Sequence, residues 1–195
     1  EAEIAAVRDR FDRGSRSVML VGPGGIGKTR LALSVAREWA GRAFWFDLAE
    51  ARSLDRMCAQ IAEVVRIQLR EGDALEQLSR GLAALGSALF VFDNLEQLLP
   101  AAGAALARIA ESAPEATLLG TGRVALGIRG EARVHVGALP LEHGVALFMD
   151  RAVRPPTEAE RPAVAALVET LDGVPLAIEL AAARTGVLPV SEVCR

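Results

Sequence analysis

The sequence predicts an α/β fold, in which a parallel sheet of about five strands carries helices on both faces and a small all-helical lid domain follows. Short apolar runs alternate with segments whose apolar residues recur at helical spacing. This alternation is typical of a parallel sheet that is covered on both faces. From Leu141 to the end of the chain only the helical spacing remains, which predicts the helical domain.

The first two elements follow from simple patterns. Ile4, Val7 and Phe11 fall on one face of a helix, so residues 1–13 are expected to be helical. The apolar run at 17–21 ends at glycines and predicts a buried strand.

The next pair repeats this order. Leu31, Val35 and Trp39 recur at helical spacing and predict a helix that ends near Gly41. A strand over 43–46 is then expected to end in an aspartate, Asp47.

The rest of the first domain continues the alternation. Helical patterns cover 53–67, 73–85 and 95–112, and apolar runs at 88–92, 116–119 and 134–136 predict three more strands. Asp93 stands at the tip of one of these strands, and Arg123 follows another.

The second domain reads as three helices, over 142–153, 158–172 and 175–186. Prolines at 155–156 and the Gly173-Val174-Pro175 segment separate them. We therefore expect a nucleotide-binding α/β domain over 1–137 and a small helical domain over 138–195, truncated at its C-terminal end.

Composition excludes several classes of protein. The net charge of −3 and the pI near 5.5 argue against direct nucleic-acid binding by this fragment. Two distant cysteines suit neither a zinc site nor a disulfide framework. No apolar run reaches the length of about 20 residues that a membrane span needs. The chain opens without a methionine or a signal pattern, so we expect an excised piece of a longer cytoplasmic protein.

One segment carries a strong nucleotide-binding signal. Between a predicted strand and a predicted helix, Gly22-Pro23-Gly24-Gly25-Ile26-Gly27-Lys28-Thr29 fits the phosphate-binding pattern G-x-x-x-x-G-K-[ST] at every fixed position. Glycines let backbone N–H groups face phosphate oxygens, and the helix N-terminus favours the same anion. The predicted nucleotide-binding residues are Gly22, Gly24, Gly25, Ile26, Gly27, Lys28, Thr29 and Arg30.

Acidic residues at a strand end are expected to complete the site. Lys28 would reach the β- and γ-phosphates, and Thr29 with Asp93 would hold Mg²⁺. Many ATPases place a second acid directly after the first, but here that residue is Asn94, which cannot accept a proton. Glu96 stands two residues further on as the alternative base, so we predict slow hydrolysis.

Two further features indicate which nucleotide the site is expected to bind. Arg123 follows a strand and is placed to sense the γ-phosphate through a charge-assisted pair. Lys28 is the single lysine among the 22 basic residues, so the N-K-x-D motif that reads guanine is absent. ATP or ADP, with Mg²⁺, is the expected cofactor.

With these residues in view, the chain resembles the nucleotide-binding core of STAND-class AP-ATPases (NB-ARC), closest to the bacterial branch in multidomain transcriptional regulators. The stretches that carry the resemblance are 22–33, 89–99, 118–131 and 171–183. The resemblance implies that the Arg123 strand lies between those of Lys28 and Asp93. It also implies that Pro175 approaches the adenine and that a winged-helix domain follows residue 195.

The predicted function is that of an ATP/ADP switch in a signalling protein, a transcriptional regulator or a cell-death or defence protein. Exchange or slow hydrolysis would control domain packing, with further domains of the same chain as partners and a homo-oligomer in the ATP state. The alternatives are an AAA+ or RecA-like motor, for which Arg184 could serve as a sensor, a small-molecule phosphotransferase, and a nucleotide-bound scaffold without turnover.

Overall fold

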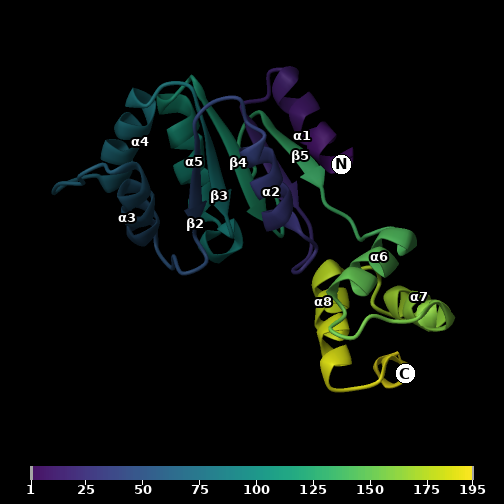
Figure 1. The fold of residues 1–195 in the computed structure, drawn as a ribbon. Coiled ribbons are helices and arrows are strands. Elements are labelled where there is room, and N and C mark those ends of the chain that lie inside the picture. Colours follow the sequence, from purple (N-terminus) through teal and green to yellow (C-terminus); the bar gives the residue numbers. More distant parts are fainter. Residues whose placement is uncertain (1, 195) are drawn as a thin grey trace. The chain divides into compact units, whose positions relative to one another are not determined.

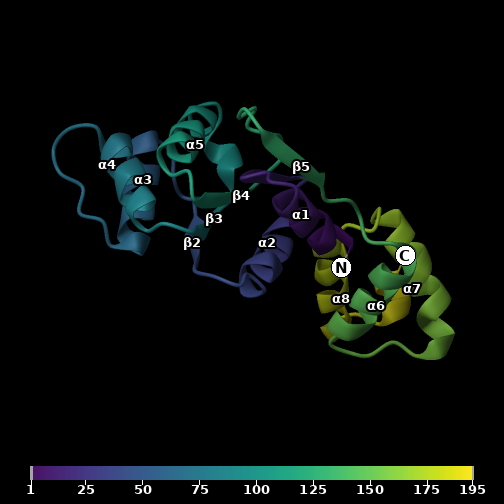
Figure 2. The same ribbon diagram turned by 90° about the horizontal axis from the view of Figure 1, so that it is seen from above.

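The chain forms two compact units, which we describe separately. The computed structural model describes residues 2–194. The first unit takes in the chain up to Gly22 and the segment Lys28–His135. The second unit takes in Pro23–Gly27 and the chain from Val136 onward. Figures 1 and 2 show the sheet in the first unit and only helices and loops in the C-terminal part of the second. The division at residue 137 that the sequence suggests stays a prediction.

A five-stranded sheet runs through the first unit. Its strands lie in the order β2 (Ala43–Asp47), β3 (Ala88–Asp93), β4 (Ala116–Gly122), β1 (Ser17–Val21) and β5 (Glu131–His135). Each pair of neighbours is parallel. The predicted parallel sheet is therefore confirmed, and β4 does lie between β1 and β3.

Helices cover both faces of this sheet. α1 (Ala2–Asp12) and α2 (Lys28–Arg37) pack on one face, while α3 (Leu54–Val65), α4 (Ala74–Ala84) and α5 (Ala101–Ser112) form a layer on the other (Figure 2). All six residues of β3 are buried, as expected for the interior strand of a sheet that is covered on both sides.

The core beneath α3, α4 and α5 is built on alternate residues of neighbouring strands. The rings of Phe44 and Phe90 lie 5.5 Å apart, and those of Phe46 and Phe92 lie 5.1 Å apart. Because side chains alternate along a strand, the odd-numbered residues of β2 and β3 face the side of α2. Full burial of a phenylalanine stabilises the fold by about 1.5–3 kcal/mol. Keeping these rings buried beneath α3, α4 and α5 therefore fixes which face of each strand points toward α2.

Several elements differ in extent from the sequence predictions, including the following three. The helix expected over 95–112 is interrupted by Pro100, which separates a 3₁₀ turn, η1 (Leu95–Leu98), from α5. Proline has no N–H to donate and its φ is fixed. β4 continues past Leu119 to Gly122 because the residues that follow Leu119 still pair with β1. β5 begins and ends earlier than the expected 134–136, because the ladder with β1 includes polar Glu131 and Arg133.

The C-terminal part of the second unit contains the expected helices and one short addition. α6 (Leu141–Arg151), α7 (Arg161–Thr170), α8 (Pro175–Ala183) and α9 (Val190–Val193) are joined by turns that include η2 (Glu158–Glu160) and η3 (Arg184–Gly186). Phe148, Val164 and Ile178, from three different helices, are fully buried together. α9 is absent from the sequence prediction because four residues are too few for a periodic pattern.

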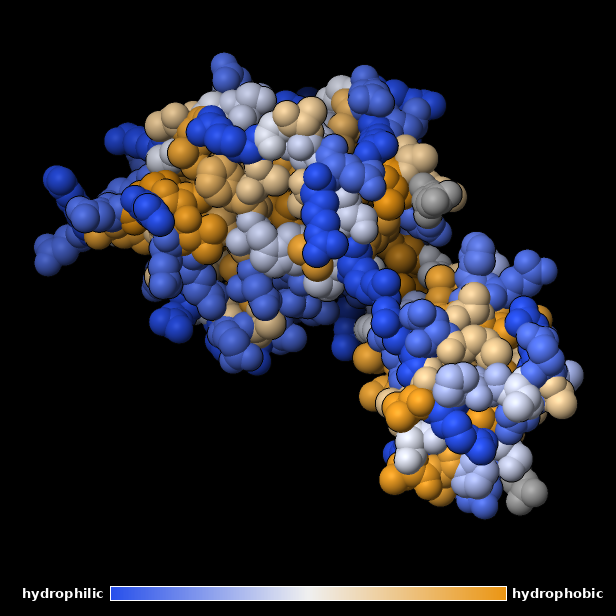
Figure 3. Space-filling view, viewed as in Figure 1, coloured by the Kyte–Doolittle hydropathy of each residue, from blue (hydrophilic) through white to orange (hydrophobic). Residues whose placement is uncertain are grey.

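Apolar side chains also reach the surface of the second unit. Leu180 is 62% exposed and Val187 is 85% exposed. Figure 3 shows apolar and charged residues interspersed on the visible face of both units. Within residues 2–194, none of the helices has the length and apolar character that crossing a membrane requires.

Candidate functional site

The glycine loop that follows β1 depends on glycine at two positions. Gly25 has a φ of 75° and Gly27 a φ of 101°, a region that side chains with a Cβ rarely adopt. A Cβ at Gly25 would also lie 2.8 Å from the Cβ of Leu176. Ile26, between these glycines, is buried. Both glycines therefore have a backbone role that alanine could not fill.

Lys28 begins α2 and its ammonium group turns back toward β1. Its Nζ donates a hydrogen bond to the Gly22 carbonyl at 2.9 Å, and the residue is only 8% exposed. Burial lowers the pKa of Lys28, while the nearby carboxylates of Glu96 and Asp93 oppose that shift. The lysine is thus held at the carboxyl end of the sheet, beside two acidic groups.

Asp93 ends β3 and is 3% exposed. The Thr29 hydroxyl lies 3.0 Å from each of its carboxylate oxygens. Thr121 contacts Oδ1 of the same carboxylate, and the Asn94 side-chain amide donates to Oδ2 at 3.3 Å. Burial raises the pKa of Asp93, the hydroxyls of Thr121 and Thr29 lower it, and the charges of Asp47 and Glu96 raise it. Residues from three elements therefore orient one buried carboxylate.

Asn94 links this carboxylate to a second one. Its backbone is left-handed, with φ 65° and ψ 42°, a conformation that asparagine tolerates better than most residues. Its Nδ2 donates to Oδ1 of Asp47 at 3.0 Å and also to Asp93. Asp47 and Asp93 are paired in the register of β2 and β3. An uncharged amide thus bridges the carboxylates at the ends of two neighbouring strands.

Glu96 and Arg123 lie beside this cluster. Oε1 of Glu96 is 3.9 Å from Nε of Arg123. Among the described residues, Oε2 of Glu96 is one of two buried side-chain oxygens or nitrogens without a hydrogen-bond partner. It lies 3.7 Å from the point where a Cβ at Gly122 would be. The Arg123 side chain is 69% exposed and projects from the end of β4.

Of the residues singled out from the sequence, the first unit thus brings together Lys28, Thr29, Asp93, Glu96 and Arg123. Arg30, the third residue of α2, is exposed. The binding and catalytic roles assigned to these residues stay predictions.

The sequence analysis named Asp47 only as the end of a strand and did not name Thr121 as a site residue. The pairing of β3 with β4 is the signal that identifies Thr121. Side chains alternate along a strand, and the register pairs Phe92 with Gly120, so Asp93 and Thr121 point to the same face of the sheet.

In the second unit, the glycine loop contacts the start of α8. The backbone N–H of Leu176 donates to the Gly25 carbonyl at 3.1 Å. Pro175 is the first residue of this helix, where a missing N–H costs nothing. Gly173, just before it, has a φ of 63°, and a Cβ there would lie 2.5 Å from the Leu139 carbonyl oxygen. The Gly173-Val174-Pro175 segment thus places α8 next to the loop within this unit.

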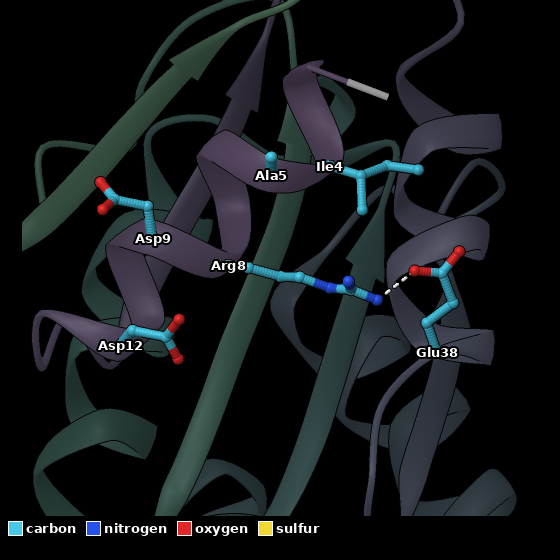
Figure 4. A pocket seen from close by; sticks show the side chains of 6 residues that line it. All are labelled: Ile4, Ala5, Arg8, Asp9, Asp12 and Glu38. Carbon is cyan, nitrogen blue, oxygen red and sulfur yellow. Dashed lines mark hydrogen bonds and ion pairs between the residues drawn. The ribbon is translucent and has the colours of Figure 1, made fainter.

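A separate shallow pocket lies between α1 and α2 (Figure 4). Ile4, Ala5, Arg8, Asp9, Asp12 and Glu38 line it, and Arg8 pairs with Glu38 across it. None of the predicted site residues belongs to this pocket. Within residues 2–194, no group of three or more His, Cys, Asp and Glu side chains has an arrangement that could hold a metal ion by itself.

The chain is similar in sequence to several mycobacterial proteins, and no family model matches it. It is 36% identical, over 203 aligned residues, to an uncharacterized protein of Mycobacterium tuberculosis, covering 99% of this chain and 51% of that protein. It is 35% identical, over 178 residues, to a protein of the same organism named "Putative HTH-type transcriptional regulator", covering 87% of this chain and 20% of the relative. The chain therefore spans about half the length of the first relative and a fifth of the second.

Solved structures with a similar fold are P-loop ATPases. A Walker-type ATPase of Pyrococcus abyssi has a TM-score of 0.74 at 14% identity, covering 99% of this chain and 69% of that one. Cdc6p from Pyrobaculum aerophilum has a TM-score of 0.70 at 17% identity, with coverages of 91% and 58%. A STAND protein with a tetratricopeptide repeat sensor from Pyrococcus horikoshii has a TM-score of 0.63 at 19% identity, with coverages of 89% and 28%. The chain has the α/β fold of P-loop NTPases.

Proposed function

We propose that this chain is the nucleotide-binding switch module of a STAND-class signalling ATPase, which binds ATP or ADP with Mg²⁺ and hydrolyses ATP slowly. The observation that carries the proposal is the pair formed by Thr29, the last residue of a complete phosphate-binding loop sequence, and the buried carboxylate of Asp93. A P-loop NTPase needs a hydroxyl and a carboxylate at these places.

The side chains fit a nucleotide with its cation. Thr29 and Asp93 offer hydroxyl and carboxylate oxygens, the ligand type that Mg²⁺ prefers, and they would hold the ion. Bound there, the ion would neutralise charge on the phosphate oxygens. Lys28 would exchange its bond to the Gly22 carbonyl for phosphate oxygens. Arg123, exposed at the end of β4, would pair with the γ-phosphate and distinguish ATP from ADP.

Slow hydrolysis is the expected consequence of the residues after Asp93. Asn94 has no basic group, and its amide is engaged by Asp47 and Asp93. Glu96 has a buried carboxylate oxygen without a hydrogen-bond partner, and this oxygen would take the proton of a water molecule. Because the oxygen is on a 3₁₀ turn rather than directly after the strand, we expect weak rather than fast ATPase activity.

The larger role of the protein is proposed from its relatives and its resemblance. Nucleotide exchange or hydrolysis in the α/β domain, residues 1–137, would change its packing with the helical, ARC1-like domain, residues 138–195. Further domains of a longer chain would read that change, with a homo-oligomer forming in the ATP state. The similarity to a relative named as a transcriptional regulator supports a role in transcription control.

Fluorescently labelled ATP and ADP, titrated against the wild type and Lys28→Ala, test this proposal. We expect the variant to lose affinity about a hundredfold for both nucleotides, since the ammonium group is the point charge on the phosphates. Arg37→Ala, at the other end of α2, removes a positive charge from the same helix and is the matched control. Equal affinities in wild type and Lys28→Ala would contradict the proposal.

A motor of the AAA+ or RecA type is a second candidate, favoured by the fold similarity to Cdc6p. Arg184, which follows α8 in η3, would then act as a sensor. Sedimentation of the full-length protein with ATP separates the two candidates. A stable hexamer, whose ATPase activity per subunit rises steeply with protein concentration, would favour the motor over the switch.

A further inference from the structure

Thr121 lies beside Asp93 on the face of the sheet that α2 covers. The register of β3 and β4 pairs Phe92 with Gly120, so the next residues, Asp93 and Thr121, are cross-strand neighbours with the same orientation. Thr121 is 1% exposed and Asp93 is 3% exposed. The hydroxyl and the carboxylate therefore meet away from water, where a hydrogen bond is strong and an unmet polar group is costly.

The direction of this hydrogen bond follows from a third group. The backbone N–H of Asn94 donates to Oγ1 of Thr121 at 3.0 Å, and an amide N–H can only donate. The Thr121 hydroxyl is thus an acceptor from Asn94, and its single proton is available to Oδ1 of Asp93, with which it is hydrogen-bonded. A directed chain results, from the Asn94 amide through the Thr121 hydroxyl to the carboxylate.

This chain supports the same carboxylate that Thr29 contacts, from a different strand. The Thr29 hydroxyl is equidistant, at 3.0 Å, from both oxygens of Asp93, so Thr29 alone does not select one orientation of the carboxylate plane. Thr121 contacts Oδ1, while the Asn94 side chain contacts Oδ2. Because Thr121 and Asn94 donate to different oxygens, together they fix the rotation of the carboxylate plane, which Thr29 alone does not.

We propose that Thr121 is a positioning residue, whose hydroxyl holds the Asp93 carboxylate in the orientation that a divalent cation needs and so sets the Mg²⁺-dependent part of the nucleotide affinity. The inference rests on the proposed function. Groups that orient a metal-binding carboxylate change metal affinity by about 10–100-fold when they are removed. Thr121 itself touches neither nucleotide nor ion in this proposal, so its loss should leave the Mg²⁺-free affinity for nucleotide unchanged.

The test compares ATP affinity with Mg²⁺ and with EDTA in the wild type, Thr121→Val and Thr121→Ser. Valine keeps the shape of threonine without the hydroxyl, and serine keeps the hydroxyl without the methyl group. We expect the gain in affinity on adding Mg²⁺ to fall about tenfold in Thr121→Val and to be retained in Thr121→Ser. The melting-temperature rise on adding Mg²⁺ to the ADP-bound protein should follow the same order. Thr117→Val, the same change on the same strand, is the matched control.

Each result decides the inference. It is overturned if Thr121→Val keeps the full Mg²⁺-dependent gain, if Thr121→Val loses affinity equally with and without Mg²⁺, or if serine does not restore the gain. Should Thr121→Val fail to fold, Thr121→Ala takes its place in the comparison with Thr121→Ser. A wild-type protein that binds no nucleotide would contradict the proposed function and the inference together. A wild type that responds to Mg²⁺, alongside a valine variant that responds equally, would contradict only the role of Thr121.

Discussion

Two aspartates in the first unit, Asp93 and Asp73, differ in burial, in hydrogen-bond partners and in the direction of their pKa shifts. Asp93 is buried at the tip of β3 and accepts from hydroxyl and amide groups. Asp73 is the exposed N-cap of α4. It accepts from the Glu76 backbone N–H at 2.9 Å and pairs with Arg108 at 2.9 Å. Burial raises the pKa of Asp93, whereas the backbone bond from Glu76, followed by Arg108, lowers that of Asp73.

The difference lies in what neighbours each carboxylate. Arg108 also pairs with Glu76 at 2.6 Å, so the start of α4 has its charges balanced within the fold and is anchored to α5. Around Asp93, the charges of Asp47 and Glu96 oppose ionisation. A buried carboxylate with two other carboxylates nearby is a poor stabilising element but a suitable place for a cation. A perturbed pKa at such a place favours a functional role, and a satisfied helix cap favours a structural one.

The largest effect should come from removing the buried carboxylate. In Asp93→Ala we expect the Mg²⁺-dependent part of the ATP affinity to fall about a hundredfold and hydrolysis to fall with it, because Thr29 loses its carboxylate partner. Calorimetric titration with and without Mg²⁺ measures the change. Asp73→Ala is the matched control. Similar losses in both variants would show that the two carboxylates do not differ in role.

A smaller effect, confined to turnover, is expected at Glu96. Glu96→Gln keeps the size of the side chain but cannot accept a proton, so ATP hydrolysis should slow about tenfold while nucleotide affinity stays the same. Single-turnover conversion of bound ATP to ADP provides the measurement, with Glu63→Gln, at an exposed position of α3, as the control. Turnover that is unchanged in Glu96→Gln would remove Glu96 from the mechanism, whereas a wild type that does not convert bound ATP would favour a nucleotide-bound scaffold.

The smallest effect concerns stability at Asp73. Its lowered pKa means that the folded state binds this proton less readily than the unfolded state. Its contribution is thus complete above the ordinary aspartate pKa of about 3.9 and is lost as the pH falls through the folded-state value. Asparagine also caps helices but does not titrate. The melting temperature of the wild type, measured from pH 6 down to about pH 3, should therefore fall more than that of Asp73→Asn. Parallel curves would show that the charge of Asp73, through its bond from Glu76 and its pair with Arg108, adds no pH-dependent stability.

The order of strands and helices could be predicted because each has a local cause. Apolar runs such as 88–92 lie on interior strands, and the glycine loop separates a strand from a helix. The interruption at Pro100 and the extension of β4 to Gly122 were missed for different reasons. To predict the interruption, Pro100 would have had to count for more than the helical spacing around it. The extension of β4 depends on pairing with β1, which no local sequence pattern contains.

The sequence by itself determined the fold class, the loop that marks a P-loop NTPase, and the chemical types at the candidate site, because spacing and residue type are local properties. Only the tertiary structure decided which groups meet. It set Thr121 between Asn94 and Asp93, joined Asp47 to Asp93 through an amide, and left one Glu96 oxygen buried without a partner. These contacts join residues on different strands and turns, and their geometry depends on sheet register and burial, which arise only when the whole unit packs.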